Sequence, residues 1–302
     1  MKKVVCKAYG KVNLTLDVLG KRPDGYHEVL TVLQGISLHD LVSLEIGGSH
    51  EKGGQGIQLT CDIPQLSTGP ENLAYRAAEL LREDFPQLGG IKIHLTKRIP
   101  LAAGLAGGSA DAAAVLLGLN SLAGLGLSLA DLRRYAARLG SDVPFCLEPL
   151  TAIGKGRGER ITECAQAPEI WLTLAKPPFN VATKDAYENL HKVTITNRPH
   201  TEKVLEGLDR QDEDLMYAHM GNVLEEATFD MYPELREWKK EMEELGAAKV
   251  LMSGSGPTLI GFFPTQEEAQ KFAVSFHKPQ WEIAVARTIT RDDLAERVDY
   301  HE

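Results

Sequence analysis

A glycine-rich segment, PLAAGLAGGSAD at residues 100–111, has the composition of a phosphate-binding loop. Gly104, Gly107 and Gly108 lack side chains that would keep backbone N–H groups away from an anion. The segment precedes an expected helix, whose N-terminus attracts negative charge and where Ser109 can cap the helix or offer a hydroxyl to phosphate or metal-bound water. It matches neither the Walker nor the dinucleotide-binding pattern, because no lysine follows the glycines and Ala106 separates Gly104 from Gly107. Taken alone, it equally fits a tight strand-to-helix turn without a ligand.

Two charged residues have types suited to phosphoryl transfer, although they lie far apart in the sequence. Asp142, in a loop that Gly140 and Pro144 constrain, can accept or orient the proton of an attacking hydroxyl. Lys11 can lower the pKa of that aspartate, polarise the hydroxyl or stabilise the transferred group. A lone lysine–aspartate pair is more often a surface contact, so the pair by itself does not indicate catalysis.

The segment NLTLDVLGKRPDGYHEV, residues 13–29, offers groups that suit a nucleobase. Tyr26 has an aromatic face for stacking and His27 has polar ring atoms for a base edge. The same residues could form a turn into the next strand, and Asp24 fits such a turn better than a catalytic role. Asn13 projects to the same side as Lys11 if the strand is extended, and we expect it to hydrogen-bond a substrate.

Alternation and helical periodicity place these residues on an α+β fold. In the first half we expect strands at residues 29–36, 41–46, 57–61 and 91–95, a loop at 47–56, and helices at 71–84, 109–120 and 128–140. In the second half we expect strands at 170–175, 248–252, 257–263 and 283–288, a helix from Thr183, and helices at 213–227, 232–246 and about 265–276. A glycine-rich stretch at 154–160 predicts a boundary between domains 1–155 and 156–302.

Composition limits the classes of partner. A net charge of −9 over 302 residues argues against non-specific binding to nucleic acid or an anionic membrane. No stretch of 18 apolar residues occurs, and no signal peptide is recognisable. Four scattered cysteines without metal-ligand spacing predict reduced thiols. We expect a cytoplasmic protein, a monomer or weak homodimer, that acts on a small molecule.

Three motifs in order resemble those of the GHMP kinases, the superfamily of galactokinase, homoserine kinase, mevalonate kinase and phosphomevalonate kinase. They are KAYGKVNLTLDVLGKRPDGYHEV at 7–29, the glycine loop, and MSGSGPTLIGFF at 252–263. The resemblance implies two domains with the active site in the cleft between them, Lys11 and Asp142 as catalytic residues, and ATP as co-substrate with Mg²⁺, for which no protein ligand is assigned. It places ATP along the loop, at Pro100, Leu101, Ala102, Ala103, Gly104, Leu105, Ala106, Gly107, Gly108, Ser109 and Ala110.

The N-terminal motif and GSDVPFCL at 140–147 are similar to one branch of these kinases. Its substrate is a cytidine-diphosphate-linked methylerythritol, phosphorylated on the 2-hydroxyl for isoprenoid synthesis. The resemblance implies that Tyr26 and His27 contact the cytidine and that Tyr187 is a second stacking aromatic, although Tyr187 also fits a packed helix residue. A kinase for another alcohol and a non-catalytic nucleotide-binding protein are the alternatives, and the presence of both Lys11 and Asp142 opposes the second.

Two residues differ from those that are frequent at the same positions in the GHMP kinases. Ala106 stands where many members have glycine, and its methyl group fits if the residue keeps a negative φ. Gly10 stands where alanine is frequent, which predicts a more flexible strand at Lys11. Neither change removes a reacting group.

Overall fold

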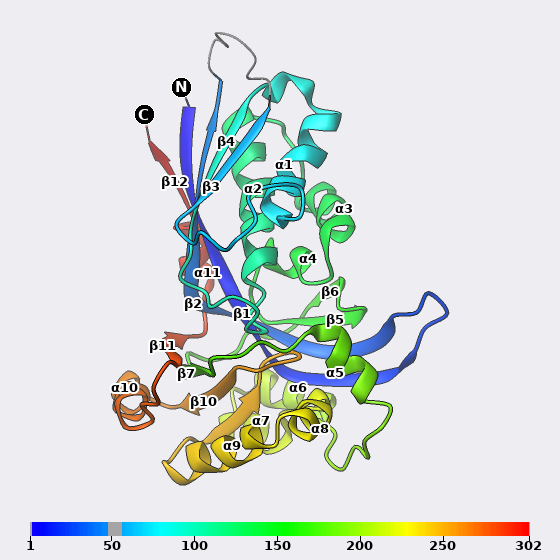
Figure 1. The fold of residues 1–302 in the computed structure, drawn as a ribbon, viewed down its shortest axis with the longest axis vertical. Coiled ribbons are helices and arrows are strands. Elements are labelled where there is room, and N and C mark those ends of the chain that lie inside the picture. The colour runs from blue at the N-terminus through cyan, green and yellow to red at the C-terminus, as the bar shows by residue number, and fades with distance from the viewer. Residues whose placement is uncertain (1, 48–55, 302) are drawn as a thin grey trace.

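A computed structural model describes residues 2–47 and 56–301 (Figure 1). In its first half the elements are β1 (Lys2–Lys21), β2 (His27–Ile46), β3 (Ile57–Cys61), α1 (Leu73–Asp84), the short 3-10 helix η1 (Pro86–Leu88), β4 (Ile91–Thr96), α2 (Gly107–Ala123), α3 (Leu129–Leu139), α4 (Val143–Cys146), β5 (Ala152–Gly156) and β6 (Arg160–Glu163). In the second half they are β7 (Trp171–Lys176), α5 (Thr183–Asn189), α6 (Thr201–Arg210), α7 (Glu213–His219), β8 (Gly221–Asn222), α8 (Leu224–Met231), α9 (Glu234–Glu244), β9 (Lys249–Met252), β10 (Leu259–Phe263), α10 (Gln266–Ser275), β11 (Glu282–Arg287), α11 (Arg291–Ala295) and β12 (Val298–His301).

The first sheet is built on a long hairpin of β1 and β2. Its strand order is β12-β1-β2-β4-β3, with β5 also paired to β2, and α1 to α4 cover one face (Figure 1). The alanine-rich helix α2 is buried along most of its length against this sheet, because its small side chains let backbones approach closely. The hairpin therefore carries Lys11 and Asn13 past the helix that follows the glycine loop.

The second sheet has the order β11-β7-β10-β9 and packs against helices of the second half. Strand β8 pairs in parallel with β1 at Thr15 and Leu16, so this half also reaches the first sheet. None of the helices in the described parts of the chain has the combined length and apolar character needed to cross a bilayer.

The α+β class is confirmed, and most expected elements occur within a few residues of their predicted positions. The capping box of Ser128 and Asp131 begins α3, and Gly140 follows its end, as predicted. Residues 29–36 and 41–46 form a single strand rather than two, because β2 pairs with β1 along nearly its whole length. Most of the loop expected at 47–56, namely 48–55, lies outside the described residues.

One predicted helix, 213–227, is wrong. It is divided into α7 and α8, with β8 between them, because Gly221 and Asn222 pair with β1. The Asn222 amide also donates to the carbonyls of Met252 and Gly254, at 2.7 Å each. These are tertiary bonds, which helical periodicity does not report, and α6 is an additional helix that we did not predict.

The domain limit between 155 and 156 remains a prediction. It falls inside the β5–β6 hairpin, and β12, at the end of the chain, pairs with β1 at its beginning. Figure 1 shows the two ends side by side. The N-terminal sheet therefore includes strands from both predicted domains.

Candidate active site

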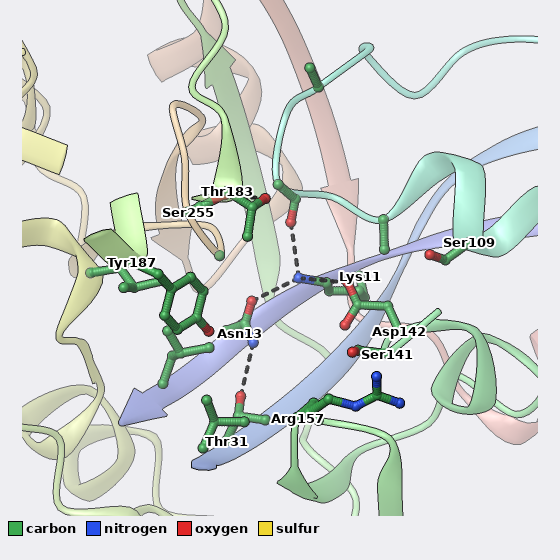
Figure 2. A pocket seen from close by; sticks show the side chains of 18 of the residues that line it. Lys11, Asn13, Thr31, Ser109, Ser141, Asp142, Arg157, Thr183, Tyr187 and Ser255 are labelled. Atoms are coloured by element: carbon green, nitrogen blue, oxygen red, sulfur yellow. Dashed lines mark hydrogen bonds and ion pairs between the residues drawn. The ribbon is translucent and has the colours of Figure 1, made fainter. Parts of the chain in front are cut away.

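A cavity of about 770 Å³ brings the predicted site residues together (Figure 2). Its lining includes the predicted catalytic and substrate-binding residues, most of the glycine loop and part of the loop after β9: Lys11, Asn13, Tyr26, His27, Pro100, Leu101, Ala102, Ala103, Gly104, Ala106, Gly107, Gly108, Ser109, Asp142, Tyr187, Gly254 and Ser255. Leu105 and Ala110 lie outside this lining and are buried in the core. We call the part around Lys11, Gly104 and Asp142 the phosphate end, and the part around Tyr26 and His27 the base end.

Lys11 is the centre of the phosphate end. Its Nζ donates to Asn13 Oδ1 at 2.9 Å and to the Gly104 carbonyl at 3.0 Å, as Figure 2 shows. Both Lys11 and Asn13 are only 3% exposed. The Asn13 amide donates to Thr31 Oγ1 at 2.9 Å, so the amide orientation is fixed by a residue of β2. The i, i+2 spacing of a strand places both side chains on one face, as expected.

Asp142 reaches the same point from another element. It occupies the N-cap position of α4, directly after the turn that ends α3, and its Oδ2 lies 3.8 Å from Lys11 Nζ. Its side chain is 37% exposed, whereas that of Lys11 is 4% exposed. The carboxylate therefore faces the open cavity while the ammonium group approaches it from the protein side.

The glycine loop joins β4 to α2 as predicted, but the helix begins earlier than expected, at Gly107. Its N-cap is Ala106, with no side-chain hydrogen bond, so the expected capping by Ser109 does not occur. A negative φ, the condition under which the Ala106 methyl group would fit without strain, is not met, because φ is 59°. An L-residue with a Cβ is disfavoured in this left-handed region, so Ala106 carries backbone strain at the loop.

The loop after β9 packs directly on the glycine loop. A Cβ at Gly104 would lie 2.1 Å from the Ser253 carbonyl oxygen, so only glycine permits this approach. Ser253 Oγ donates to the Gly104 carbonyl at 3.0 Å, the same oxygen that accepts from Lys11. The two glycine motifs, far apart in sequence, therefore form one structure beside Lys11.

A buried charge cluster that the sequence analysis did not identify supports the glycine loop. Lys97 Nζ is paired with Asp40 and, at 2.6 Å, with Asp111 Oδ2. Asp40 Oδ1 accepts from the backbone N–H groups of Arg98 and Ile99, at the start of the loop. Burial raises the pKa of Asp111 to about 7, against the opposing effect of Lys97. Burial opposes the charge on Lys97, but Asp111 and Asp40 together raise its pKa. The signal available in the sequence was Asp40, a lone acidic residue in the largely apolar run SLHDLVSL.

The base end is more open. Tyr26 is 55% exposed at the tip of the β1–β2 hairpin, with the Arg157 guanidinium 4.8 Å from its ring centre. His27 stacks on Tyr187 of α5 at 4.9 Å, and its Nε2 lies 3.0 Å from Nε2 of His191, which the sequence analysis did not identify. Burial lowers the pKa of His27, and His191 and Lys21 add to this effect. Asp24 accepts from the Tyr26 N–H at 3.1 Å, so it is a turn residue, as expected.

The cavity can hold a phosphate group beside the Lys11–Asp142 pair. At its opposite end, it can hold an aromatic group of a ligand. Within the described residues, no group of three or more His, Cys, Asp or Glu side chains forms a metal site. The four cysteines are free, with Cys6 and Cys146 buried and Cys61 and Cys164 partly exposed.

Comparison with known proteins agrees with this geometry. Residues 72–148 match the GHMP kinases N terminal domain, and residues 204–279 match the GHMP kinases C terminal domain. The 4-diphosphocytidyl-2-C-methyl-D-erythritol kinase of Pelotomaculum thermopropionicum is 44% identical over 285 residues, covering 94% of this chain and 98% of that protein. The protein of the same name from Brevibacillus brevis is 45% identical, covering 89% of each chain.

Solved structures give the same result. A crystal structure of 4-(cytidine 5'-diphospho)-2C-methyl-D-erythritol kinase is 35% identical, with a TM-score of 0.79, and the match covers 95% of this chain and all (100%) of that one. A homoserine kinase from Cytophaga hutchinsonii, 21% identical with a TM-score of 0.73, shares the fold over 96% of this chain and 94% of its own. The chain therefore belongs to the GHMP kinases, in the family of 4-diphosphocytidyl-2-C-methyl-D-erythritol kinases.

Proposed function

We propose that this protein transfers the γ-phosphoryl group of ATP to the 2-hydroxyl of 4-diphosphocytidyl-2-C-methyl-D-erythritol, for isoprenoid precursor synthesis. The observation that carries the proposal is the meeting of Lys11, Gly104 and Asp142 at one point of the cavity. A surface ion pair would not need a lysine buried to 3% exposure and bound to the glycine loop. The names of the relatives supply the substrate.

In the proposed step, the 2-hydroxyl oxygen forms a bond to the γ-phosphorus. The bond from that phosphorus to the β–γ bridging oxygen breaks, and ADP leaves. Asp142 accepts or aligns the hydroxyl proton, since its carboxylate faces the cavity. Lys11 stabilises the charge that develops on the transferred group, held in place by Asn13 and the Gly104 carbonyl.

The glycine loop and the start of α2 are assigned to the ATP phosphates. Gly107, Gly108 and Ser109 form the first turn of α2, where backbone N–H groups have no intrahelical partners. Mg²⁺ suits this site, because it keeps phosphate and water ligands and needs few from protein. When bound, it would neutralise charge on the phosphate oxygens, and the Ser109 hydroxyl, which lines the cavity, can be offered to phosphate or to a metal-bound water.

The base end is assigned to the cytidine part of the substrate. Tyr26, His27 and Tyr187 present aromatic rings there, and stacking on such rings stabilises a bound base. A second cavity, of about 420 Å³, shares Pro100 and Leu101 with the first and offers room for the nucleoside of ATP. The net charge of −9 supports a small-molecule substrate rather than nucleic acid. We propose a monomer or weak homodimer that works in the cytoplasm.

The decisive experiment measures ADP release by the purified protein with MgATP and one of four alcohols: the cytidyl alcohol, homoserine, mevalonate or galactose. We expect turnover with the cytidyl alcohol and none above the alcohol-free control with the other three. Lack of turnover with the cytidyl alcohol, in a protein that binds ATP, would contradict the proposal.

A GHMP kinase for another alcohol is the remaining alternative. It would not depend on the base end, so a Tyr26→Ala, His27→Ala double variant separates the two functions. Loss of activity with the cytidyl alcohol, in a folded variant, supports the proposed substrate. Unchanged activity would mean that the hairpin tip does not recognise cytidine.

A further inference from the structure

The last residues of the chain are attached to the strand that carries Lys11. Strand β12 pairs with β1 from Lys3 to Cys6, and the Lys7 N–H continues this pairing by donating to the Arg297 carbonyl at 2.9 Å. Tyr9 Oη donates to the carbonyl of Asp293, in α11, at 3.0 Å. In Figure 1, α11 lies close to the first sheet, of which β12 is the edge strand.

The Arg297 side chain makes three hydrogen bonds, all to backbone carbonyls. Nε donates to Lys7 O at 3.0 Å, Nη1 to Leu147 O at 2.8 Å and Nη2 to Cys146 O at 2.8 Å. The residue is 4% exposed, and no carboxylate among the described residues forms an ion pair with it. A buried guanidinium usually has an acidic partner. Arg297 has carbonyl acceptors instead, and their positions fix the orientation of its guanidinium group.

The carbonyls that accept from Arg297 belong to two elements of the phosphate end, α4 and β1. Cys146 and Leu147 lie at the end of α4, one turn after Asp142, and the Asp142 carbonyl accepts from the Cys146 N–H at 3.1 Å. Lys7 precedes Lys11 in β1, and the pairing of β1 with β2 is irregular between Tyr9 and Lys11. Such an irregularity re-aims the side chains that follow it. Arg297 therefore joins the Asp142 element to the Lys11 strand without lining the cavity.

Attachment of the C-terminal segment does not depend on Arg297 alone. Arg287 pairs with both carboxylate oxygens of Asp293, at 2.7 and 2.9 Å, and Thr290 and Asp293 form a capping box for α11. Strand β12 adds its own ladder with β1. The bonds of Arg297 to Cys146 and Leu147 are thus additional to what anchors the segment, and they act on α4.

We propose that Arg297 is a positioning residue that sets the separation of Asp142 and Lys11 by tying α4 to β1. The inference rests on the proposed function, since it assigns the two residues to one reaction. Arg297 contacts neither substrate nor reacting atoms. Its loss should therefore slow the chemical step while leaving the binding of ATP and of the alcohol almost unchanged, because small displacements of reacting groups lower rates steeply.

The test compares Arg297→Lys with Arg287→Lys in the full-length chain. Both substitutions keep the charge and weaken a contact of the same segment, but only the first releases the carbonyls of Cys146 and Leu147. We expect kcat to fall about 10- to 100-fold in Arg297→Lys, with both KM values within about threefold. We expect kcat of Arg287→Lys to stay within about twofold. Circular dichroism and thermal unfolding establish that both are folded at the assay temperature.

Two results would overturn the inference: a folded Arg297→Lys with unchanged kcat, or an equal loss in Arg287→Lys. An Arg297→Gly variant prepared with millimolar guanidinium covers the case in which Arg297→Lys does not fold. If kcat falls on guanidinium dilution before the unfolding signal changes, the positioning role is supported, whereas simultaneous loss shows a purely structural role. If the unaltered protein does not turn over the cytidyl alcohol, the proposed function fails, and the comparison is made with whichever alcohol it phosphorylates.

Discussion

The two ends of the large cavity are built in opposite ways. At the phosphate end, Lys11 is 3% exposed and is held by residues from a strand and two glycine loops. At the base end, Tyr26 is 55% exposed on the tip of a hairpin, and the Arg157 guanidinium lies over its ring. The chemistry is thus placed where the fold is densest, and base recognition where one local turn presents the side chains.

Substitutions at the two ends of the cavity should therefore have different effects. Changes at the phosphate end alter groups that cannot move independently, so they should affect kcat or stability. Changes at the base end remove contact area from an exposed element, so they should affect KM and leave the fold intact. Four measurements test this distinction between the two ends of the cavity.

The largest effect is expected for Asp142→Asn. The amide cannot accept the hydroxyl proton, so kcat should fall by about 10²- to 10⁴-fold, with little change in KM. Steady-state kinetics with the cytidyl alcohol and MgATP measure it. Asp24→Asn, in the hairpin turn, is the matched control and should keep kcat. A loss confined to KM would place Asp142 in binding rather than in the transfer.

A smaller effect, of the opposite kind, is expected for Tyr26→Ala. Loss of one stacking ring corresponds to about 1–3 kcal/mol, or about a 5- to 150-fold rise in KM for the cytidyl alcohol, with kcat nearly constant. Tyr26→Phe keeps the ring and should retain KM. Because Tyr26 is exposed, the melting temperature of the Tyr26→Ala protein should equal that of the unaltered protein. A fall in kcat with constant KM would remove the distinction between the two ends.

The charge cluster at the phosphate end predicts a pH dependence of stability. Burial raises the pKa of Asp111 in the folded protein from the usual 3.8 to about 7, so the native state binds more protons than the unfolded state between these limits. Its contribution to the free energy of unfolding therefore falls as pH rises from about 4 to about 7. Urea titrations across this pH range should show that the free energy of unfolding falls less with rising pH in Asp111→Asn than in the unaltered protein.

Asp24 provides the contrast at the base end. Its hydrogen bonds from Arg22 lower its pKa, so its contribution has the opposite sign and is lost as pH falls below the usual range of an aspartate. The Asp24 side chain is 46% exposed, and solvent screens this effect. The pH profile of Asp24→Asn should therefore follow that of the unaltered protein. If Asp111→Asn and Asp24→Asn changed the pH profile of the free energy of unfolding equally, burial of Asp111 would have no special role.

The smallest effect is expected for Ala106→Gly. Glycine relieves the left-handed φ of 59° but increases the entropy of the unfolded chain, so we expect a net gain of about 0.5–1 kcal/mol. Thermal unfolding should show a rise of about 1–3 °C. Ala103→Gly, at a buried position without positive φ, is the control and should destabilise the protein. A loss of stability in Ala106→Gly would mean that the methyl group packs favourably.

Local patterns in the sequence predicted the local structure well. Ser128, Asp131 and Gly140 marked the limits of α3, and the glycine loop was placed correctly between β4 and α2. These features depend on residues close together in the chain, which is why spacing reveals them. The motifs at Lys11, the glycine loop and residues 252–263 also indicated the family without any coordinates.

Contacts between segments that are distant in the sequence could be seen only in the three-dimensional structure. Gly104 could be recognised as a loop glycine, but its approach to Ser253 depends on how two halves of the chain pack. Asp40, Lys97 and Asp111 form a cluster because a strand, a loop and a helix meet, and Arg297 contacts α4 because the last strand returns to the first. The residue types and their motifs already showed which groups are available for catalysis. Their distances, burial and pKa values arose from contacts between remote residues, which no local periodicity encodes.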